Sequence, residues 1–267
     1  MSPRAPSAAF PRVRWRDGRP EAGHRELPEE AAVALVHDAT TTAVMMATPA
    51  DLEDFAVGFS LTEGLVASAD EILGLDVEHG ELGVEVRAWL ARPSGARLTE
   101  RRRRIAGPTG CGLCGVDSLA EAARPLPRVG QDLRLTADLV QSAVRSIATA
   151  QQLGAATRAV HAAGYWRERG GLAALREDVG RHNALDKLAG AMARQGLAQD
   201  DGVLVLTSRV SVEMVQKAAV MGVQVIAAIS APTALAVRVA QASGIGLAAV
   251  VREDGFEVFS GHERFAR

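Results

Sequence analysis

Cysteine and lysine are scarce in this chain of 267 residues. The two cysteines, Cys111 and Cys114, lie in one loop, which excludes a framework of disulfide bonds and makes a reducing cytoplasm the expected compartment. Lysine occurs only at Lys187 and Lys217, while arginine supplies the remaining basic charge. A lysine that persists against such a bias is expected where a compact ammonium group is needed and a guanidinium would not serve.

Long apolar runs and a large net charge are also missing. No stretch is long and apolar enough to cross a bilayer, and residues 1–20 lack the apolar region of a secretory signal. The formal net charge is −2, so no overall field attracts nucleic acid or a membrane surface. With 48% hydrophobic and 23% charged residues, the composition is that of a globular protein with a sizeable core. We therefore expect neither nucleic acid nor a membrane among its partners.

The order of apolar and polar segments predicts an α/β protein. Residues 1–28 are rich in proline and arginine and are expected to form a flexible arm. Residues 29–106 predict a smaller α+β subdomain, whose helix is expected to begin at Thr48 as N-cap. Residues 107–130 form a cysteine loop and linker. Over residues 131–267, apolar strands alternate with helices, which predicts a sheet covered on both faces.

Polar residues gather where predicted strands end. The block from Glu177 to Lys187 joins a strand to a helix, and two further strand ends carry Ser208–Ser211 and Ser230–Thr233. Ligands of open α/β sheets bind at such strand ends, and a helix N-terminus with Arg181 and His182 favours an anion. The alternative is a plain capped helix, with Asp178 as its cap and Asp186 paired to a base. Ser211 is likewise expected to cap the helix that carries Glu213 and Lys217.

The pair Cys111 and Cys114 is compatible with three chemistries: a disulfide switch, half of a metal site, or a nucleophilic thiolate that carries a group. A zinc deaminase site is disfavoured, because His161 is followed by two alanines and the required Glu is missing. Glycines around the cysteines disfavour a rigid thioredoxin-type turn. A thiolate carrier remains, and the arginine run 101–104 would favour the thiolate form.

From about Glu29 to its end, the chain resembles the FdhD family of formate dehydrogenase accessory sulfurtransferases. The resemblance rests on the blocks at 48–59, Cys111-Gly-Leu-Cys-Gly, His161-Ala-Ala, Glu177-Asp-Val-Gly-Arg-His-Asn-Ala-Leu-Asp-Lys187, 208–214 and Ala231-Pro-Thr. It implies a cytidine-deaminase-like three-layer α/β/α core without zinc or another intrinsic metal, a smaller N-terminal α+β extension, and a cytoplasmic homodimer.

The resemblance also implies a sulfur carrier. Sulfur would pass from an IscS-type cysteine desulfurase, as a persulfide on Cys111, to the molybdenum (or tungsten) bis-molybdopterin guanine dinucleotide before it enters the formate dehydrogenase catalytic subunit. Cys114 would resolve or relay the sulfur. The residues expected to bind this cofactor are Val250, Val251, Arg252, Glu253, Asp254, Gly255, His161, Arg181, His182, Asn183, Lys187, Ser208, Arg209, Ser211 and Lys217.

Two readings remain beside the sulfur carrier: a cofactor chaperone without catalysis, and a thiol redox switch. The chain also departs from the family at two places. Arg158 and Ala159 stand where the family commonly has glycines, and Ser208 stands where it often has glycine before the arginine. Both departures remove backbone freedom near the expected cofactor site.

Overall fold

The computed structural model describes residues 4–91, 126–199 and 201–266, and its core is built on a six-stranded sheet in the order β13-β12-β11-β10-β8-β9. The central strands β10, β11 and β12 run parallel, and β8, β9 and β13 run antiparallel to their neighbours. The strands are β8 (His161–Arg167), β9 (Gly171–Asp178), β10 (Gly202–Leu206), β11 (Val225–Ala228), β12 (Gly246–Arg252) and β13 (Gly255–Ser260).

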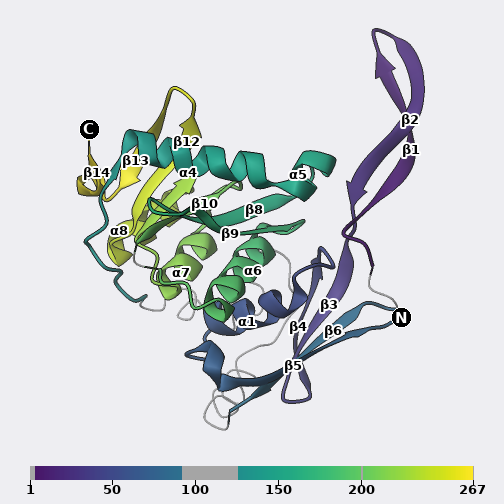
Figure 1. The fold of residues 1–267 in the computed structure, drawn as a ribbon, viewed down its shortest axis with the longest axis horizontal. Coiled ribbons are helices and arrows are strands. Elements are labelled where there is room, and N and C mark those ends of the chain that lie inside the picture. The colour runs from purple at the N-terminus through teal and green to yellow at the C-terminus, as the bar shows by residue number, and fades with distance from the viewer. Residues whose placement is uncertain (1–3, 92–125, 200, 267) are drawn as a thin grey trace.

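Helices cover both faces of this sheet (Figure 1). One face packs against α4, whose Val140, Ala143 and Ile147 are buried, and the other against α6, α7 and α8. The three-layer α/β/α core expected from the sequence is thus confirmed. The helices are α4 (Ala137–Ala150), α5 (Gln152–Thr157), α6 (Arg181–Arg194), α7 (Val212–Val220) and α8 (Ala234–Ser243).

The helical segment after Thr136 is divided in two, because the chain leaves the helical conformation at Gln151, with ψ of 107°, and then begins α5. At the opposite end of the fold, the short strands β7 (Leu135–Thr136) and β14 (Phe265–Ala266) pair with each other. The buried guanidinium of Arg264 donates to Gln224 and to two backbone carbonyls there, which ties the C-terminal segment to the core.

Among the described residues, the N-terminal subdomain combines a four-stranded sheet with the α-helix α1, which agrees with the expected α+β character. Its strands follow the order β4-β3-β6-β5, and α1 covers one face around Phe55, Val33 and Leu35. The apolar pattern does not indicate β5, because most of its side chains are only partly buried and polar residues interrupt it. The elements are β3 (Ala31–His37), β4 (Thr40–Ala47), α1 (Leu52–Thr62), β5 (Ile72–His79) and β6 (Val84–Leu90).

Residues 7–28 form a regular β-hairpin, which corrects the expectation of a flexible arm. Strands β1 (Ser7–Arg16) and β2 (Arg19–Pro28) pair over their full length and extend away from the body (Figure 1). Asp17 and Gly18 close the hairpin, both with positive φ, at 49° and 74°. An Asp-Gly pair is the usual sequence for a two-residue turn of this hand, so the turn signal outweighs the proline-rich composition.

The helix α1 does not begin at Thr48, so that expectation is also wrong. Asp51 precedes its first residue in the left-handed conformation, with φ of 53°. Thr48 lies outside the helix and is buried: its N–H donates to Asp178, and its hydroxyl accepts from the N–H of Val179. The threonine therefore joins the N-terminal subdomain to the core instead of capping its own helix.

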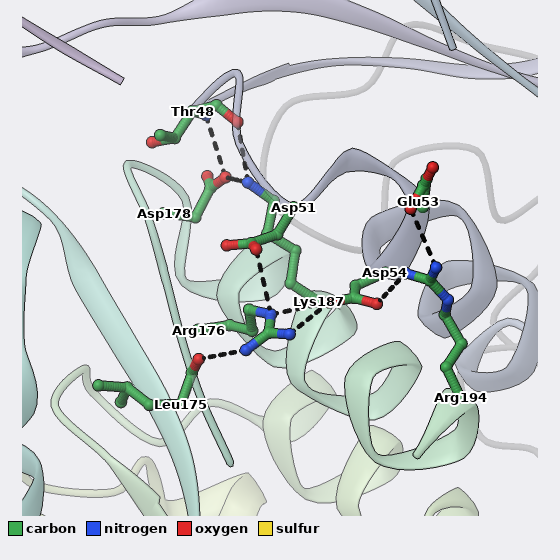
Figure 2. A network of polar contacts seen from close by, with 9 residues as sticks. All are labelled: Thr48, Asp51, Glu53, Asp54, Leu175, Arg176, Asp178, Lys187 and Arg194. Atoms are coloured by element: carbon green, nitrogen blue, oxygen red, sulfur yellow. Dashed lines mark hydrogen bonds and ion pairs between the residues drawn. The ribbon is translucent and has the colours of Figure 1, made fainter. Parts of the chain in front are cut away.

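The two subdomains meet where α1 crosses α6 at very short range. A Cβ atom placed on Gly58 would lie 1.7 Å from the carbonyl oxygen of Asp186, and one on Gly190 would lie 1.9 Å from that of Asp54. Only glycine permits such an approach of two backbones. Figure 2 shows the polar side of the contact, where Asp54 accepts from Arg176 and Arg194 at 2.6 Å each.

Among the helices of the described residues, none has the length and apolar character needed to cross a membrane.

The crossing gives a direct test. Gly58→Ala should lower the free energy of unfolding by at least about 3 kcal/mol, because a methyl group there overlaps main-chain atoms that cannot move independently. The matched control is Gly80→Ala, whose added Cβ would meet its nearest atom at an ordinary 3.5 Å. Urea denaturation of both variants measures the difference. Equal losses in the two variants would show that the helices are not in contact at Gly58.

Candidate functional site

The strand ends predicted to carry a ligand meet at one edge of the core sheet. The antiparallel pairing sets His161, at the start of β8, opposite Asp178, at the end of β9. Thr207, just past β10, donates its N–H to Ala162. The turn after β11 continues the row, since Val210 and Thr233 are linked by a backbone hydrogen bond of 2.9 Å. The structure therefore brings the three polar turns together as expected.

Four polar atoms at this edge are buried without a hydrogen-bond partner among the described residues. They are Nε of Arg181, Nε2 of His182, Oγ of Ser211 and Oε2 of Glu213. The first two belong to the first turn of α6, and the other two to the start of α7. Ser211 is the N-cap residue of α7 by position, as expected, but its side chain makes no capping hydrogen bond. Buried polar groups are nearly always paired, and four unpaired ones on neighbouring helix ends indicate a binding site for a polar ligand.

Burial and nearby positive charges keep the two histidines at this edge, His161 and His182, neutral. Burial and the nearby charges of Arg181 and Lys217 lower the pKa of His182 to about 4. Burial and Arg181 also lower the pKa of His161. At neutral pH the imidazoles therefore serve as hydrogen-bonding groups, and the positive charge comes from Arg181. This combination suits a ligand that carries both negative charge and neutral polar groups.

Lys217 lies behind the edge in a buried network. Its ammonium donates to Asp186 at 2.7 and 2.9 Å, and at 3.0 Å to Thr62 and Glu63. Burial alone would lower the pKa of Lys217, but the charges of Asp186 and Glu63 outweigh it and raise the pKa. The N–H donors of Lys217 are all occupied by protein groups, so its ammonium does not reach the edge. Its charge acts on the site only by lowering the pKa of His182.

Two further residues expected to bind the cofactor lie in the interior, as Lys217 does. Lys187 is fully buried and donates to Asp178 at 2.5 Å and to the carbonyl of Thr48 at 2.8 Å (Figure 2). The amide of Asn183 donates to Asp178 and to the carbonyl of Met46. Both side chains hold the segment before α6 against the N-terminal subdomain, and in this way they position Arg181 and His182.

Other predicted residues lie along the same edge. Ser208 is buried and donates to the carbonyl of Arg209, whose side chain is exposed. The guanidinium of Arg252 donates to the carbonyl of Ile229 at 2.6 Å, which holds the β12–β13 hairpin beside the turn after β11. The predicted binding segment Val250, Val251, Arg252, Glu253, Asp254 and Gly255 forms this hairpin tip.

Val250 is strained within that segment. Its φ is 55°, a left-handed value that a β-branched residue rarely adopts, and its N–H donates to Ser230 at 3.4 Å. The strand pairing shifts register here, between Ala249 and Arg252. Backbone strain of this kind persists where a function or the surrounding structure requires it, and here it falls in the predicted binding segment.

Cys111, Cys114 and the arginine run 101–104 lie outside the described residues, so their roles stay predictions. In the part of the chain that the structure does describe, no three His, Cys, Asp or Glu side chains gather in a way that could hold a metal ion.

The sequence did not single out Glu213 and Glu63 as site residues. Glu213 contributes an unpaired buried oxygen to the edge, and Glu63 pairs with Lys217 at 3.0 Å. Glu213 could have been recognised from the sequence, because it lies two residues after Ser211 in the block 208–214. No local sequence pattern could have indicated Glu63, because its partner Lys217 is 154 residues away.

The buried pair of Lys187 and Asp178 leads to a prediction on stability. Lys187→Met should cost about 3 to 5 kcal/mol of unfolding free energy, because it leaves the Asp178 charge buried without its counter-ion. Adding Asp178→Asn to that variant should recover part of the loss. A double-mutant cycle by urea denaturation measures the coupling. A loss below about 1 kcal/mol in the single variant would show that the pair is not buried as described.

His182 leads to a prediction on pH dependence. Its pKa is about 4 in the folded protein and about 6.5 when unfolded, so its contribution to stability is complete above pH 6.5 and is lost as pH falls toward 4. The full effect is about 3 kcal/mol. Denaturation between pH 4.5 and 7.5 should show a smaller acid loss for His182→Gln than for the unsubstituted protein. Identical pH profiles would contradict a buried neutral imidazole.

Comparisons with known proteins agree with the fold and motifs. The model of the FdhD/NarQ family matches residues 28–266. The chain is 48% identical to the sulfur carrier protein FdhD of Agrobacterium fabrum, over 95% of this chain and 94% of that one. It is 53% identical to the protein of the same name from Brucella abortus, over 88% of each.

A solved structure agrees as well. The crystal structure of a protein from Desulfotalea psychrophila, described as a formate dehydrogenase accessory protein, superposes with a TM-score of 0.76 at 26% identity. The match covers 98% of this chain and 100% of that one. Because the family model and these relatives extend over most of its length, this chain belongs to the FdhD/NarQ family.

Proposed function

We propose that this protein is a sulfur carrier. It accepts sulfur from a cysteine desulfurase and transfers it to the molybdenum (or tungsten) bis-molybdopterin guanine dinucleotide before that cofactor enters formate dehydrogenase. The observation that carries the proposal is the set of four unpaired buried polar atoms at the strand-end edge, in a chain whose only cysteines lie three positions apart in one glycine-rich stretch of sequence. The names of its relatives, sulfur carriers and a formate dehydrogenase accessory protein, support the same role.

The sulfur step is a thiolate exchange. The Cys111 thiolate attacks the terminal sulfur of the desulfurase persulfide, the sulfur–sulfur bond of the donor breaks, and the desulfurase cysteine leaves as a thiolate. Cys111 then carries one additional sulfur atom and no net oxidation occurs. Cys114, three residues away, is the group that resolves or relays this persulfide. In resolution its thiolate attacks the Cys111 sulfur, a Cys111–Cys114 disulfide forms and the outer sulfur leaves as sulfide for the acceptor; in relay it attacks the outer sulfur and Cys111 leaves as a thiolate.

The acceptor is the substrate held at the strand-end edge. Arg181 supplies a positive charge for a nucleotide phosphate at the start of α6, where backbone N–H groups also favour an anion. His182 and Ser211 supply neutral hydrogen-bonding groups, and the Glu213 carboxylate supplies the acceptor that the N–H groups of a guanine base require. The exposed hairpin tip at Arg252 completes the edge on its far side. We further propose that the protein works in the cytoplasm as a homodimer.

The proposal predicts that Cys111→Ala abolishes persulfide loading, because the attacking thiolate is gone. The protein is incubated with a cysteine desulfurase and cysteine, and intact mass spectrometry records an adduct of about 32 Da, one sulfur atom. Cys114→Ala is the matched control, and its persulfide loading should be only partly reduced relative to the unsubstituted protein. Full loading of the Cys111 variant would contradict the assignment.

The same measurement separates the remaining readings. A cofactor chaperone without catalysis would bind guanine nucleotides and show no sulfur adduct. A redox switch would form a reversible bond between Cys111 and Cys114 and would be indifferent to the desulfurase. Either result in the unsubstituted protein would replace the sulfur-carrier proposal.

A further inference from the structure

A cleft lies between the N-terminal hairpin and the end of α5. It has a volume of about 440 Å³ and is lined by Arg12, Val13, Arg14, Arg25 and Arg158. Four of these five residues carry a guanidinium group, and they come from three separate elements. None of the residues predicted from the sequence to bind a ligand belongs to this cleft.

The hairpin register explains three of the four arginines. Arg12 and Arg14 are two residues apart on β1 and therefore share one face of the hairpin. Arg25 on β2 lies opposite Phe10, which places it on that face as well. Its guanidinium donates to the carbonyl of Thr157 at 3.2 Å, and this hydrogen bond fixes the hairpin against the end of α5.

Arg158 stands at a position that would suit glycine. It follows the last residue of α5 in the left-handed conformation, with φ of 57° and ψ of 29°. Glycine adopts this conformation without steric cost and arginine does not. Ending the helix therefore does not require an arginine, but its side chain adds the fourth guanidinium to the cleft.

The four positive charges are not neutralised by ion pairs. Within the described residues, none of the four arginines forms a salt bridge with a carboxylate. Glu21 shares the hairpin face, opposite Arg14, without an ion pair to it, and Glu26 accepts a hydrogen bond from Ser7 at 2.6 Å. Four guanidinium groups around one small cleft repel one another, and an anion bound between them would remove that repulsion.

We propose that this cleft binds a diphosphate group. Guanidinium groups bind phosphate oxygens in pairs, and four of them match the several oxygens and charges of a diphosphate better than those of one carboxylate. The site is concave and of a size that takes a small ligand. Among the described residues no aromatic side chain lines it, so recognition rests on the phosphates and not on a base. The same contacts serve a free diphosphate and the diphosphate of a nucleotide.

The cleft lies next to the strand-end edge in the chain. Arg158 precedes His161, at the start of β8, by only three positions. A diphosphate in the cleft would therefore extend the polar edge toward the hairpin. The proposal does not depend on sulfur transfer, because its ligand is defined by the arginines alone.

The test is isothermal titration of the full chain at low salt with inorganic pyrophosphate, orthophosphate and GDP. Pyrophosphate should bind, and orthophosphate should bind at least about tenfold more weakly. Arg158→Gly should weaken pyrophosphate binding by about tenfold, with a melting temperature equal to or above that of the unsubstituted protein, because glycine suits the conformation. Arg12→Gln combined with Arg14→Gln should weaken it further.

The matched control is Arg238→Gln, an exposed arginine on α8, which should leave the affinity within about twofold. An equal loss in this control would show a general charge effect and overturn the proposal. Absence of pyrophosphate binding at millimolar concentration would overturn it as well, as would a pyrophosphate affinity that is unchanged in Arg158→Gly and in the double variant. Because GDP can also bind at the strand-end edge, its arm is evaluated from the loss in the cleft variants: an equal loss for GDP and pyrophosphate shows that a nucleotide diphosphate uses the cleft, and a loss for pyrophosphate alone restricts the ligand to the free diphosphate. The titration uses neither desulfurase nor molybdenum, so its result is separate from the persulfide experiment.

Discussion

The contact on which the rest of this structure depends is the crossing of α1 and α6, where two backbones meet at Gly58 and Gly190. A buried ammonium lies on either side of it: Lys187 pairs with Asp178, and Lys217 pairs with Asp186. Each ammonium also binds a group of the N-terminal subdomain, so both subdomains are needed to satisfy it. Buried ion pairs of this kind add little stability in themselves, but they penalise every arrangement in which a partner is missing. The crossing therefore fixes one relative position of the two subdomains.

That position determines the candidate site. The helix that α1 contacts is the one whose first turn presents Arg181 and His182 to the strand-end edge, and the segment before it is held by Thr48 from the N-terminal subdomain. Lys217 completes the connection, since it links the end of α1 to α7 and contributes to the low pKa of His182. The N-terminal subdomain is thus a support for the site, although it supplies none of the four unpaired polar atoms.

Much of this arrangement follows from local sequence. The alternation of apolar strands and helices predicts the layered core. Parallel strands bring their carboxyl ends to one edge of the sheet, whatever the order of the strands. The scarcity of lysine correctly marks Lys187 and Lys217 as unusual, because both are buried and paired. Their roles could not be predicted, since Lys187 contacts Thr48 across 139 positions and no local pattern records such a contact. The hairpin was missed for another reason: a two-residue Asp-Gly turn outweighs a composition that favours irregular structure.

Buried polar groups are paired in the junction between the subdomains and unpaired at the candidate site. This difference distinguishes residues that support the site from residues that bind a ligand. At the junction nearly every buried charge has partners from two or more elements, as Asp178 shows with four donors. At the starts of α6 and α7, four buried polar atoms have no partner among the described residues, and the left-handed Val250 adds strain on the same edge. A chain that pairs the buried charges of its junction in this way has no structural reason to leave these groups unpaired. Their cost in the free protein is consistent with a ligand that pairs them when it binds, and the fully paired junction holds them in place until it does.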